Sequence, residues 1–375
     1  MNLTLIAVVV LALFFDFTNG FHDAANAIAT SVSTRALTPR AAVVMAGLMN
    51  FAGAFISIKV ATTVGQGVVD TDVVTLNVVL AAIVGAIVWN LITWALGLPS
   101  SSSHALIGGV AGAAIAAAGF DAVQWQGVTE KVLLPSLVSI FAGIALAGLL
   151  VLAIMWAFRR LKPGPVNRIF RRLQILSAGF VALTHGTNDA QKTMGVIALA
   201  LVAANPGAQF SVPVWVIVTS ALAISLGTYA GGWRIVRTLG RRVTHLTSYQ
   251  GFAAETATAG ILFTTAHFGF PVSTTHTISG SVLGAGAARK PSAVRWGVAR
   301  SMLLAWLFTF PAAALVAAVM ERLTRLPGGA VIVFVIAVLF SAGIFFVARA
   351  QATPPPSGGL PVTTPAAPVT SGRPR

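Results

Sequence analysis

The sequence contains no cysteine and very little charge. Without cysteine, disulfides, thiolate metal sites and cysteine nucleophiles are excluded. Only 9% of the 375 residues are charged, whereas about a quarter are charged in soluble domains, and 56% are hydrophobic. Because the apolar residues are spread along the whole chain, we expect an all-α polytopic membrane protein rather than a soluble domain with an anchor.

Acidic residues are especially scarce, since 9 Asp and Glu stand against 24 Lys and Arg, for a formal net charge of +15. Such an excess can indicate a nucleic-acid partner. Here the basic residues occupy short loops between apolar runs, which is typical of the cytoplasmic loops of membrane proteins. We therefore expect the lipid bilayer as the surroundings of the chain and no nucleic-acid partner.

Several catalytic motifs are also missing. The sequence has no Gly-x-x-x-x-Gly-Lys-[Ser/Thr] loop, which argues against an ATP-driven pump. It has no His-Glu-x-x-His motif, and this absence, with the lack of cysteine, argues against an intramembrane enzyme. The first twenty residues lack a basic n-region, so we interpret them as a membrane segment and not as a cleaved signal peptide.

Apolar runs that are long enough to cross or enter the bilayer recur from one end of the chain to the other. They cover residues 3–18, 41–60, 74–96, 104–119, 132–157, 173–203, 213–231, 251–268, 272–288, 296–319 and 330–349. The first run continues through polar residues to 33, and the run 173–203 contains Gly186 and Asn188. With Gly20, Gly186 and Asn188 as candidate breaks, we expect ten to twelve transmembrane or re-entrant helices.

The basic loops also predict an orientation. Residues 158–172 contain six Lys and Arg, so we place this linker in the cytoplasm. If successive loops alternate between the two sides of the membrane, most other basic residues lie in cytoplasmic loops and no acidic residue does. The N-terminus is then outside and the C-terminus inside. The tail 351–375 is rich in Pro, Thr, Ser and Gly and is expected to be disordered.

Two pairs of motifs repeat in the same order. Residues 20–26 (Gly-Phe-His-Asp-Ala-Ala-Asn) match 186–192 (Gly-Thr-Asn-Asp-Ala-Gln-Lys), 166 positions later, and Pro99 to His104 matches Pro271 to His276, 172 positions later. The two pairs in register predict a first repeat, 1–157, and a second repeat, 173–350. Because the predicted loops place the two aspartate motifs on oppositely directed segments, the repeats are expected to be inverted. Inverted repeats with broken segments are typical of secondary transporters that bind substrate near the bilayer midplane.

The motifs predict an anion site with a coupled cation. Serine- and threonine-rich turns that open a helix expose hydroxyl and backbone N–H groups at the positive end of the helix dipole. Two such turns, one from each repeat, can share a small tetrahedral oxyanion, and Asn26, Asn188 and Lys192 are further donors. Asp23 and Asp189 can join an anion only through a proton or a cation, which predicts symport.

Three further observations concern coupling. Lys192 follows Asp189 by one helical turn, where the first repeat has Asn26, so its ammonium is expected to stand in for a cation. Glu255, alone in an apolar segment, is a candidate proton or cation site. The roles of His22, His185 and Asp16 stay open, and His104 and His276 are expected to orient their turns.

The segments 20–27, 98–109 and 186–192 resemble the inorganic phosphate transporter (PiT) family, and within it the bacterial low-affinity Pit-type permeases. The resemblance spans about 1–350. It implies an inverted-repeat phosphate symporter of the bacterial plasma (inner) membrane, a homodimer that needs no cofactor beyond its co-transported cation. The binding residues that it implies are Asp23, Asn26, Ser101, Ser102, Ser103, Asp189, Ser273, Thr274 and Thr275.

The chain departs from the sodium-coupled members, which carry Asn-Asp-x-x-Asn in both halves. Here the motifs are His22-Asp23-x-x-Asn26 and Asn188-Asp189-x-x-Lys192. The difference favours the proton-linked branch, in which phosphate can travel as a neutral metal–phosphate complex. A sodium-coupled phosphate symporter, a sulfate permease of the same family and, from another class, an anion channel are the alternatives.

Overall fold

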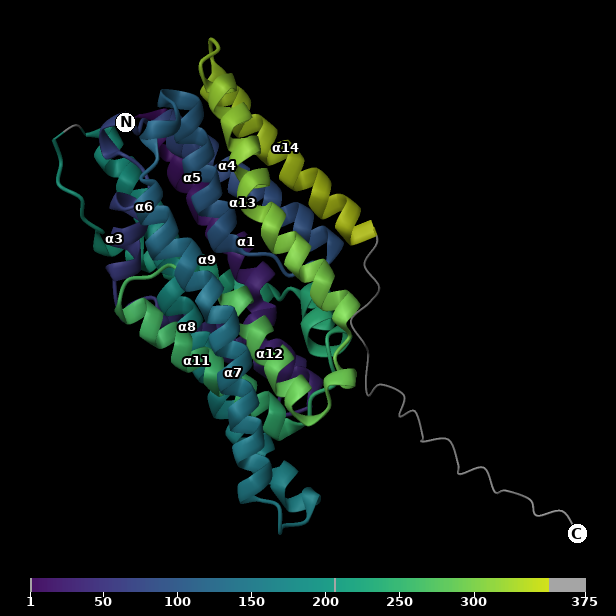
Figure 1. Cartoon of the computed structure of the whole chain (residues 1–375). Helices are drawn as coiled ribbons and strands as arrows, with labels where there is room; N and C mark the ends of the chain where they lie inside the picture. Colours follow the sequence, from purple (N-terminus) through teal and green to yellow (C-terminus); the bar gives the residue numbers. More distant parts are fainter. Residues whose placement is uncertain (1, 206, 351–375) are drawn as a thin grey trace, which may run out of the picture.

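The computed structural model describes residues 2–205 and 207–350, which form a bundle of helices (Figure 1). This part of the chain contains no β-strand, and its one isolated antiparallel bridge joins Val69 to Val123. The all-α class predicted from composition is confirmed. The tail 351–375, predicted to be disordered, lies outside the described residues.

Two long helices, α1 (Leu3–Ser33) and α8 (Pro163–Ala204), pack against each other through the middle of the bundle. They are antiparallel, because Thr34 bonds Gln174 while Asn19 bonds Asp189. The predicted breaks at Gly20, Gly186 and Asn188 are wrong, since both helices are continuous there. Helix α8 begins at Pro163, inside the predicted linker 158–172, and proline is suited to the first helical position.

The glycines that suggested breaks instead allow close helix packing. A Cβ on Gly20 would collide with the carbonyl oxygen of Ile224 on α9 (Val214–Ala230). A Cβ on Gly186 would collide with the carbonyl oxygen of Asn50 on α2 (Pro39–Gly53). Small residues are common where membrane helices approach closely. Glycine inside an apolar run therefore marked a contact between helices and not the end of one.

Two helical hairpins surround the long helices. One consists of α4 (Leu76–Leu96) and α5 (Ser102–Ala118), and the other of α11 (Ser248–His267) and α12 (Thr274–Arg289). With 17 and 16 residues, α5 and α12 are about 25 Å long, less than the roughly 30 Å hydrocarbon core. Figure 1 shows α5 toward the end of the bundle that holds the N-terminus and α12 toward the opposite end.

The remaining helices cover these elements. Helix α7 (Leu134–Ala157) packs on α12, while α13 (Trp296–Thr324) packs on α4 and α5, and α14 (Gly329–Ala350) packs on α4. Among the described residues, five helices are long and apolar enough to cross a membrane, or six if α9 and its bent continuation Trp233–Arg242 form one span. The shorter elements are α3 (Lys59–Gln66), α6 (Trp125–Gly127), α10 (Trp233–Arg237), the 3₁₀ turns Thr71–Val73, Phe120–Ala122 and Pro291–Ala293, and the π-helical turns Val128–Leu133 and Thr238–Arg242.

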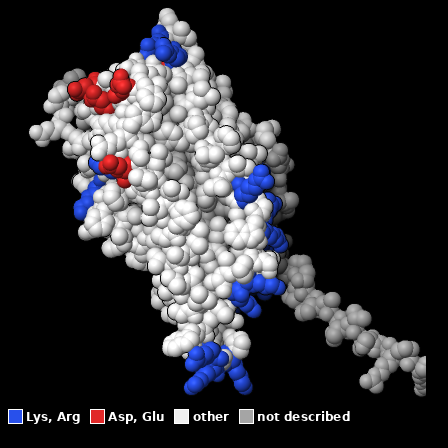
Figure 2. All heavy atoms as spheres, viewed as in Figure 1, with Lys and Arg blue, Asp and Glu red and all other residues white. Residues whose placement is uncertain are grey.

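Exposed acidic side chains gather toward one end of the bundle. Figure 2 shows the acidic side chains toward the end that holds the N-terminus in Figure 1, and a cluster of Lys and Arg at the far end. At the acidic end Arg325 donates to the carbonyl oxygens of Ala116 and Ala117, both at 3.0 Å, and so caps the end of α5. A cation at a helix C-terminus is favourable. The separation agrees with the sorting of the loops by sequence, while the side of the membrane at which each end lies stays a prediction.

We expect Gly227→Val to lower the stability of the protein, because a Cβ at this position on α9 would collide with the carbonyl oxygen of Phe17 on α1. Overpacking of this kind costs about 1–3 kcal/mol. Thermal unfolding in detergent measures the effect. The matched control is Gly260→Val on α11, where a Cβ meets no described atom within 4 Å, and equal melting temperatures for the two variants would contradict the packing role.

Candidate substrate and coupling site

The N-termini of the two short hairpin helices meet at the centre of the bundle. Ser101 caps α5 by accepting the backbone N–H of His104 at 3.1 Å, and Ser273 caps α12 by accepting that of His276 at 3.3 Å. The rings of His104 and His276 are in edge contact, with centroids 4.8 Å apart. Two positive helix-dipole ends therefore converge, which favours negative charge between them.

The ammonium group of Lys192 connects both hairpins to α8. Its Nζ donates to Asp189 Oδ1 at 2.5 Å, to Ser103 Oγ on α5 at 2.5 Å and to the carbonyl oxygen of Val272, just before α12, at 3.0 Å. The residue is 1% exposed. The three acceptors match the three N–H donors of an ammonium, so this buried charge is fully hydrogen-bonded.

Both aspartates accept hydrogen bonds from hydroxyl groups of the hairpins. Ser102 on α5 donates to Asp23 Oδ2 at 3.0 Å, and Thr275 on α12 donates to Asp23 Oδ1 at 3.4 Å. Thr274 donates to Asp189 Oδ1 at 3.2 Å, and Asn26 Nδ2 donates to the Thr275 hydroxyl at 3.0 Å. Each aspartate is thus at the centre of a buried group of hydrogen bonds that includes residues predicted from both repeats.

The hydrogen bonds of Asn50 determine which nitrogen of His185 carries a proton. The Thr228 hydroxyl donates to the carbonyl of Ile224 at 2.8 Å and so accepts from Asn50 Nδ2 at 2.7 Å. Asn50 Oδ1 then faces His185 Nδ1 at 2.9 Å, and Nδ1 is the donor because an amide oxygen only accepts. In neutral His185 the other nitrogen, Nε2, is therefore a lone-pair acceptor.

That acceptor faces two carboxylates. His185 Nε2 lies 3.3 Å from Asp189 Oδ2 and 4.0 Å from Asp23 Oδ2, and the three groups offer ligand atoms that lie within 4.8 Å of one another. Three acceptors at this distance repel one another unless a positive charge lies among them. The arrangement can hold one proton or one cation in addition to the ammonium of Lys192.

The other predicted site residues have different surroundings. Ser101 and Ser273 serve as helix caps, and the amide of Asn188 is buried without a hydrogen-bond partner among the described residues. Glu255 lies outside the central network. Its carboxylate accepts from Thr30 and Ser177, both at 2.5 Å, and from Gln174 at 3.1 Å. The structure thus joins Asp23, Asn26, Ser102, Ser103, Asp189, Lys192, Thr274 and Thr275, while Glu255 belongs to a second polar group.

Several residues of the network were not predicted. Asn19 Nδ2 donates to Asp189 Oδ2 at 3.5 Å, and it lies one helical turn before Asp23 on the same face of α1. The Thr93 and Ser100 hydroxyls each lie 3.3 Å from His22 Nε2. The other ring nitrogen of His22, Nδ1, lies 2.6 Å from Asp23 Oδ1. A helical-face projection of the aspartate motif would have revealed Asn19. The sequence indicates Asn50 less clearly, because it is only a single amide within an apolar run.

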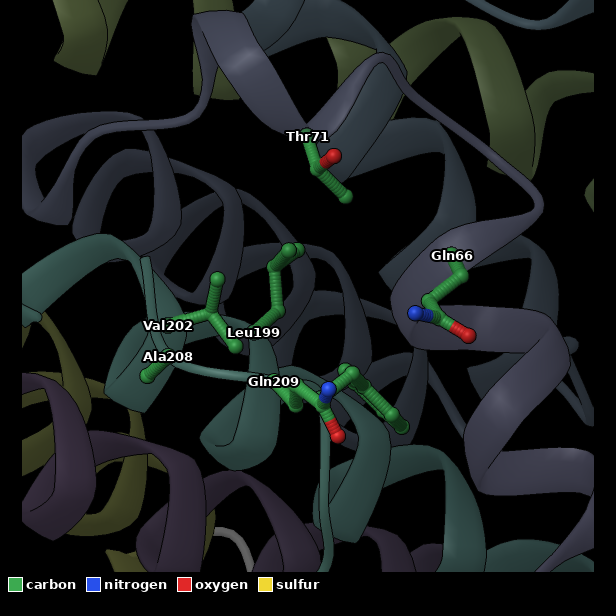
Figure 3. A pocket seen from close by; sticks show the side chains of 7 residues that line it. Gln66, Thr71, Leu199, Val202, Ala208 and Gln209 are labelled. Carbon is green, nitrogen blue, oxygen red and sulfur yellow. The ribbon is translucent and has the colours of Figure 1, made fainter. Parts of the chain in front are cut away.

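A separate cavity of about 430 Å³ lies beyond Lys192 along α8. It is lined by Gln66, Thr71, Leu199, Val202, Ala208, Gln209 and Phe210. Figure 3 shows Gln66 of α3 and Thr71 across the opening from Leu199 and Val202 of α8. None of these side chains is charged, so the cavity lacks the positive charge that Lys192 supplies at the predicted site, and no predicted site residue lines it.

Comparisons with known proteins agree with the resemblance seen in the motifs. Residues 19–317 match the model of the phosphate transporter family. The chain is 52% identical over 320 residues, 84% of this chain and 94% of the other, to a probable low-affinity inorganic phosphate transporter of Rhizobium meliloti (strain 1021). It is 45% identical to a protein of the same description from Bacillus subtilis (strain 168), over 84% of this chain and 95% of the other.

A solved structure described as "The sodium-dependent phosphate transporter" is also similar, with a TM-score of 0.77 and 25% sequence identity, over 86% of this chain and 99% of that one. The predicted family, and the prediction of a transporter rather than an enzyme, are confirmed. These comparisons do not test the roles of individual residues, which stay predictions.

We expect Lys192→Met to destabilise the protein strongly, because it leaves the buried carboxylate of Asp189 without its cation. Breaking a buried ion pair from one side costs about 3–5 kcal/mol. Adding Asp189→Asn to this variant should recover much of the loss, as measured by thermal unfolding in detergent without phosphate. The control is the exposed Lys131→Met, which should change little. A double variant no more stable than Lys192→Met would contradict the pairing.

Proposed function

Because the chain belongs to the phosphate transporter family, we propose that it is a secondary active symporter that imports inorganic phosphate, driven by a proton gradient. The protein is membrane-embedded, and the proposal places it in the bacterial plasma membrane with its N-terminus outside. One observation carries the proposal: the N-termini of α5 and α12 converge on Lys192 beside two aspartates. Such a convergence offers donors to an oxyanion from two directions.

Phosphate and the carboxylates compete for the same donors. The Ser102, Thr274 and Thr275 hydroxyls now donate to Asp23 or Asp189. A phosphate oxygen can take the place of each carboxylate oxygen, but two ionised carboxylates next to the anion would repel it. Protonation removes the charge and turns a carboxyl into a donor. Binding of phosphate and of protons is therefore linked at this site.

The residues that surround the aspartates favour a proton as the coupling ion. Lys192 already places one fixed positive charge on Asp189, at the position where the first repeat has Asn26. The remaining place, among Asp23, His185 and Asp189, offers the lone pair of His185 Nε2 between two carboxylates, and one proton there satisfies all three acceptors. Sodium is the second candidate, because the similar solved structure is described as sodium-dependent. Entry of phosphate as a metal–phosphate complex is compatible with either ion.

The arrangement of the hairpins supports a carrier over an anion channel. Helices α5 and α12 start at the same centre and extend toward opposite ends of the bundle (Figure 1). An inverted repeat would produce this arrangement, and alternating access follows when each hairpin controls one side. Sulfate stays a possible substrate, although phosphate suits a proton-binding site better because it can itself be protonated. The proposed homodimer is a separate prediction.

We expect proteoliposomes that contain the protein to accumulate labelled phosphate against its gradient when the outside is acidic, and to lose the accumulated phosphate when an ionophore abolishes the proton gradient. The measurement needs arms with a sodium gradient, with and without Mg²⁺, and with excess sulfate as competitor. Asp23→Asn and Asp189→Asn should abolish uptake. Full activity in both variants would overturn the site, and downhill flux alone would indicate a channel.

Lys192→Asn restores the residue found at the matching position of the first repeat, and we expect it to change the ion that uptake depends on. The reason is that removal of the ammonium leaves room and negative charge for a free cation beside Asp189. Uptake by the variant is compared under proton and sodium gradients, with Lys192→Arg as the charge-retaining control. An ion dependence identical to that of the unmodified protein would refute the idea that the ammonium stands in for a cation.

A further inference from the structure

A line of polar residues follows the contact between α1 and α8. On α1 the residues Asp16, Asn19, Asp23, Asn26 and Thr30 recur every three or four positions and so share one face. Along the antiparallel α8, their neighbours run from Thr193 beside Asp16 to Ser177 in the group that contains Thr30. Asp16 occupies the end of this line nearest the N-terminus, and the proposed site does not use it.

Asp16 is a buried carboxylate without a partner. It is 0% exposed, and neither oxygen has a hydrogen-bond partner in the part of the chain that the structure describes. The hydroxyl of Thr193 lies beside it and also forms no hydrogen bond among residues 2–205 and 207–350. An isolated ionised carboxylate in such a place is very costly, so it must bind a proton or a cation.

The charged groups that face Asp16 are Asp189 and Lys192, both on α8. Besides α8, the helices that pack most extensively on α1 are α9 and α4, and α9 meets α1 at Phe17, next to Asp16. Within their described spans, neither buries an Asp, Glu, His, Lys or Arg. One carboxylate and one hydroxyl are too few oxygen ligands for a metal ion. A proton is therefore the species that neutralises Asp16.

Asp16 belongs to a group in which the two halves of the chain differ. The 166-residue offset that matches Asp23 with Asp189 also matches Asp16 with Ala182, Thr193 with Ala27, and Lys192 with Asn26. All three differences lie together at one end of the α1–α8 contact. A substrate that contacts both repeats equally does not require such differences between them. Coupling to an ion that enters from one side of the membrane does require the two repeats to differ.

We infer that Asp16 is the proton-loading residue of the transport cycle, with the adjacent Thr193 hydroxyl available to donate to its ionised form, and that its charge acts on phosphate through Lys192. The inference rests on the proposed proton-coupled function and names Asp16 as the residue that carries the transported proton, distinct from a proton that stays among Asp23, His185 and Asp189. The proton adds to a carboxylate oxygen of Asp16 on the outer side and leaves from it on the inner side. No covalent bond other than this O–H forms or breaks.

Lys192 explains how one proton affects the hairpins. Its ammonium holds Ser103 of α5 and the carbonyl of Val272 before α12. When Asp16 is ionised, its negative charge competes with Asp189 for this ammonium and weakens the link between the hairpins. When Asp16 is protonated, the competition ends and the hairpins are held together around the site. Asp16 is thus a coupling residue and need not touch phosphate.

The test compares Asp16→Asn with Asp72→Asn, an exposed acid whose replacement removes the same charge, in proteoliposomes. Two activities are measured: uphill uptake driven by an acidic exterior, and exchange of labelled for unlabelled phosphate at equal pH and equal concentration on both sides. We expect Asp16→Asn to lose at least tenfold in driven uptake while it keeps exchange within about twofold, because exchange needs no net movement of protons. Asp72→Asn should keep both activities.

Two results would overturn the inference. Driven uptake by Asp16→Asn with the normal dependence on external pH would show that the proton binds elsewhere. Loss of exchange together with uptake would show a structural or substrate-binding role. Failure of the proposed function is distinguishable, because it appears in the unmodified protein as uptake that ignores the proton gradient.

A second variant keeps the test decisive if Asp16→Asn does not fold. Thr193→Val conserves the shape of the side chain and removes the adjacent hydroxyl, the group that can donate to an ionised Asp16. We therefore expect its half-maximal uptake at a higher external pH, with exchange unchanged. A pH profile identical to that of the unmodified protein would count against the partnership of Thr193 and Asp16.

Discussion

The buried ammonium group of Lys192 holds together both helical hairpins and the carboxylate of Asp189 at the centre of this protein. Two helix N-termini point at the same centre, and their positive dipole ends need negative charge nearby. Asp23 and Asp189 supply that charge, and the hydroxyl groups of both hairpins donate to it. Lys192 then balances one aspartate and binds both hairpins at once. In the proposed function the hydroxyl groups of Ser102, Thr274 and Thr275 and the ammonium of Lys192 bind the carboxylates until an anion takes their place.

The same logic explains why His185 and Asn50 belong to the site although neither was assigned a role from sequence. An imidazole next to two carboxylates would adopt whichever tautomer donates to them. Asn50 prevents this by accepting from Nδ1, and Thr228 holds the amide in that orientation. The lone pair of Nε2 is thereby kept toward Asp23 and Asp189. A residue on a neighbouring helix thus determines how much positive charge the centre can accept.

Much of the site followed from the sequence because its motifs are repeated. The repeated aspartate and proline motifs predicted that Asp23, Asp189 and the hydroxyl-rich turns would meet, and each aspartate accepts from a hydroxyl of the turns, with His185 Nε2 close to both carboxylates. Helix continuity could not be predicted in the same way. A glycine within an apolar run, such as Gly20 or Gly186, suggests a break in the helix. Only the nearby carbonyl oxygens of Ile224 and Asn50, which come from distant parts of the chain, show that these glycines are packing positions. Asn19 and Asn50 were missed for a similar reason, since their roles depend on partners more than a hundred residues away.

Under the proposed symport, in which Lys192 stands in for a cation, its attachment to the chain has a consequence for the energetics of accumulation. A bound sodium ion is released on the far side of the membrane, and each such ion contributes its electrochemical potential to the cycle, about 2.3 kcal/mol per 100 mV for the electrical part. An ammonium that is part of the polypeptide crosses nothing and contributes no such free energy. A carrier that replaces a mobile ion with a lysine therefore binds its substrate with a permanent counterion but has less concentrating power per cycle. Such a carrier suits surroundings in which its substrate is plentiful.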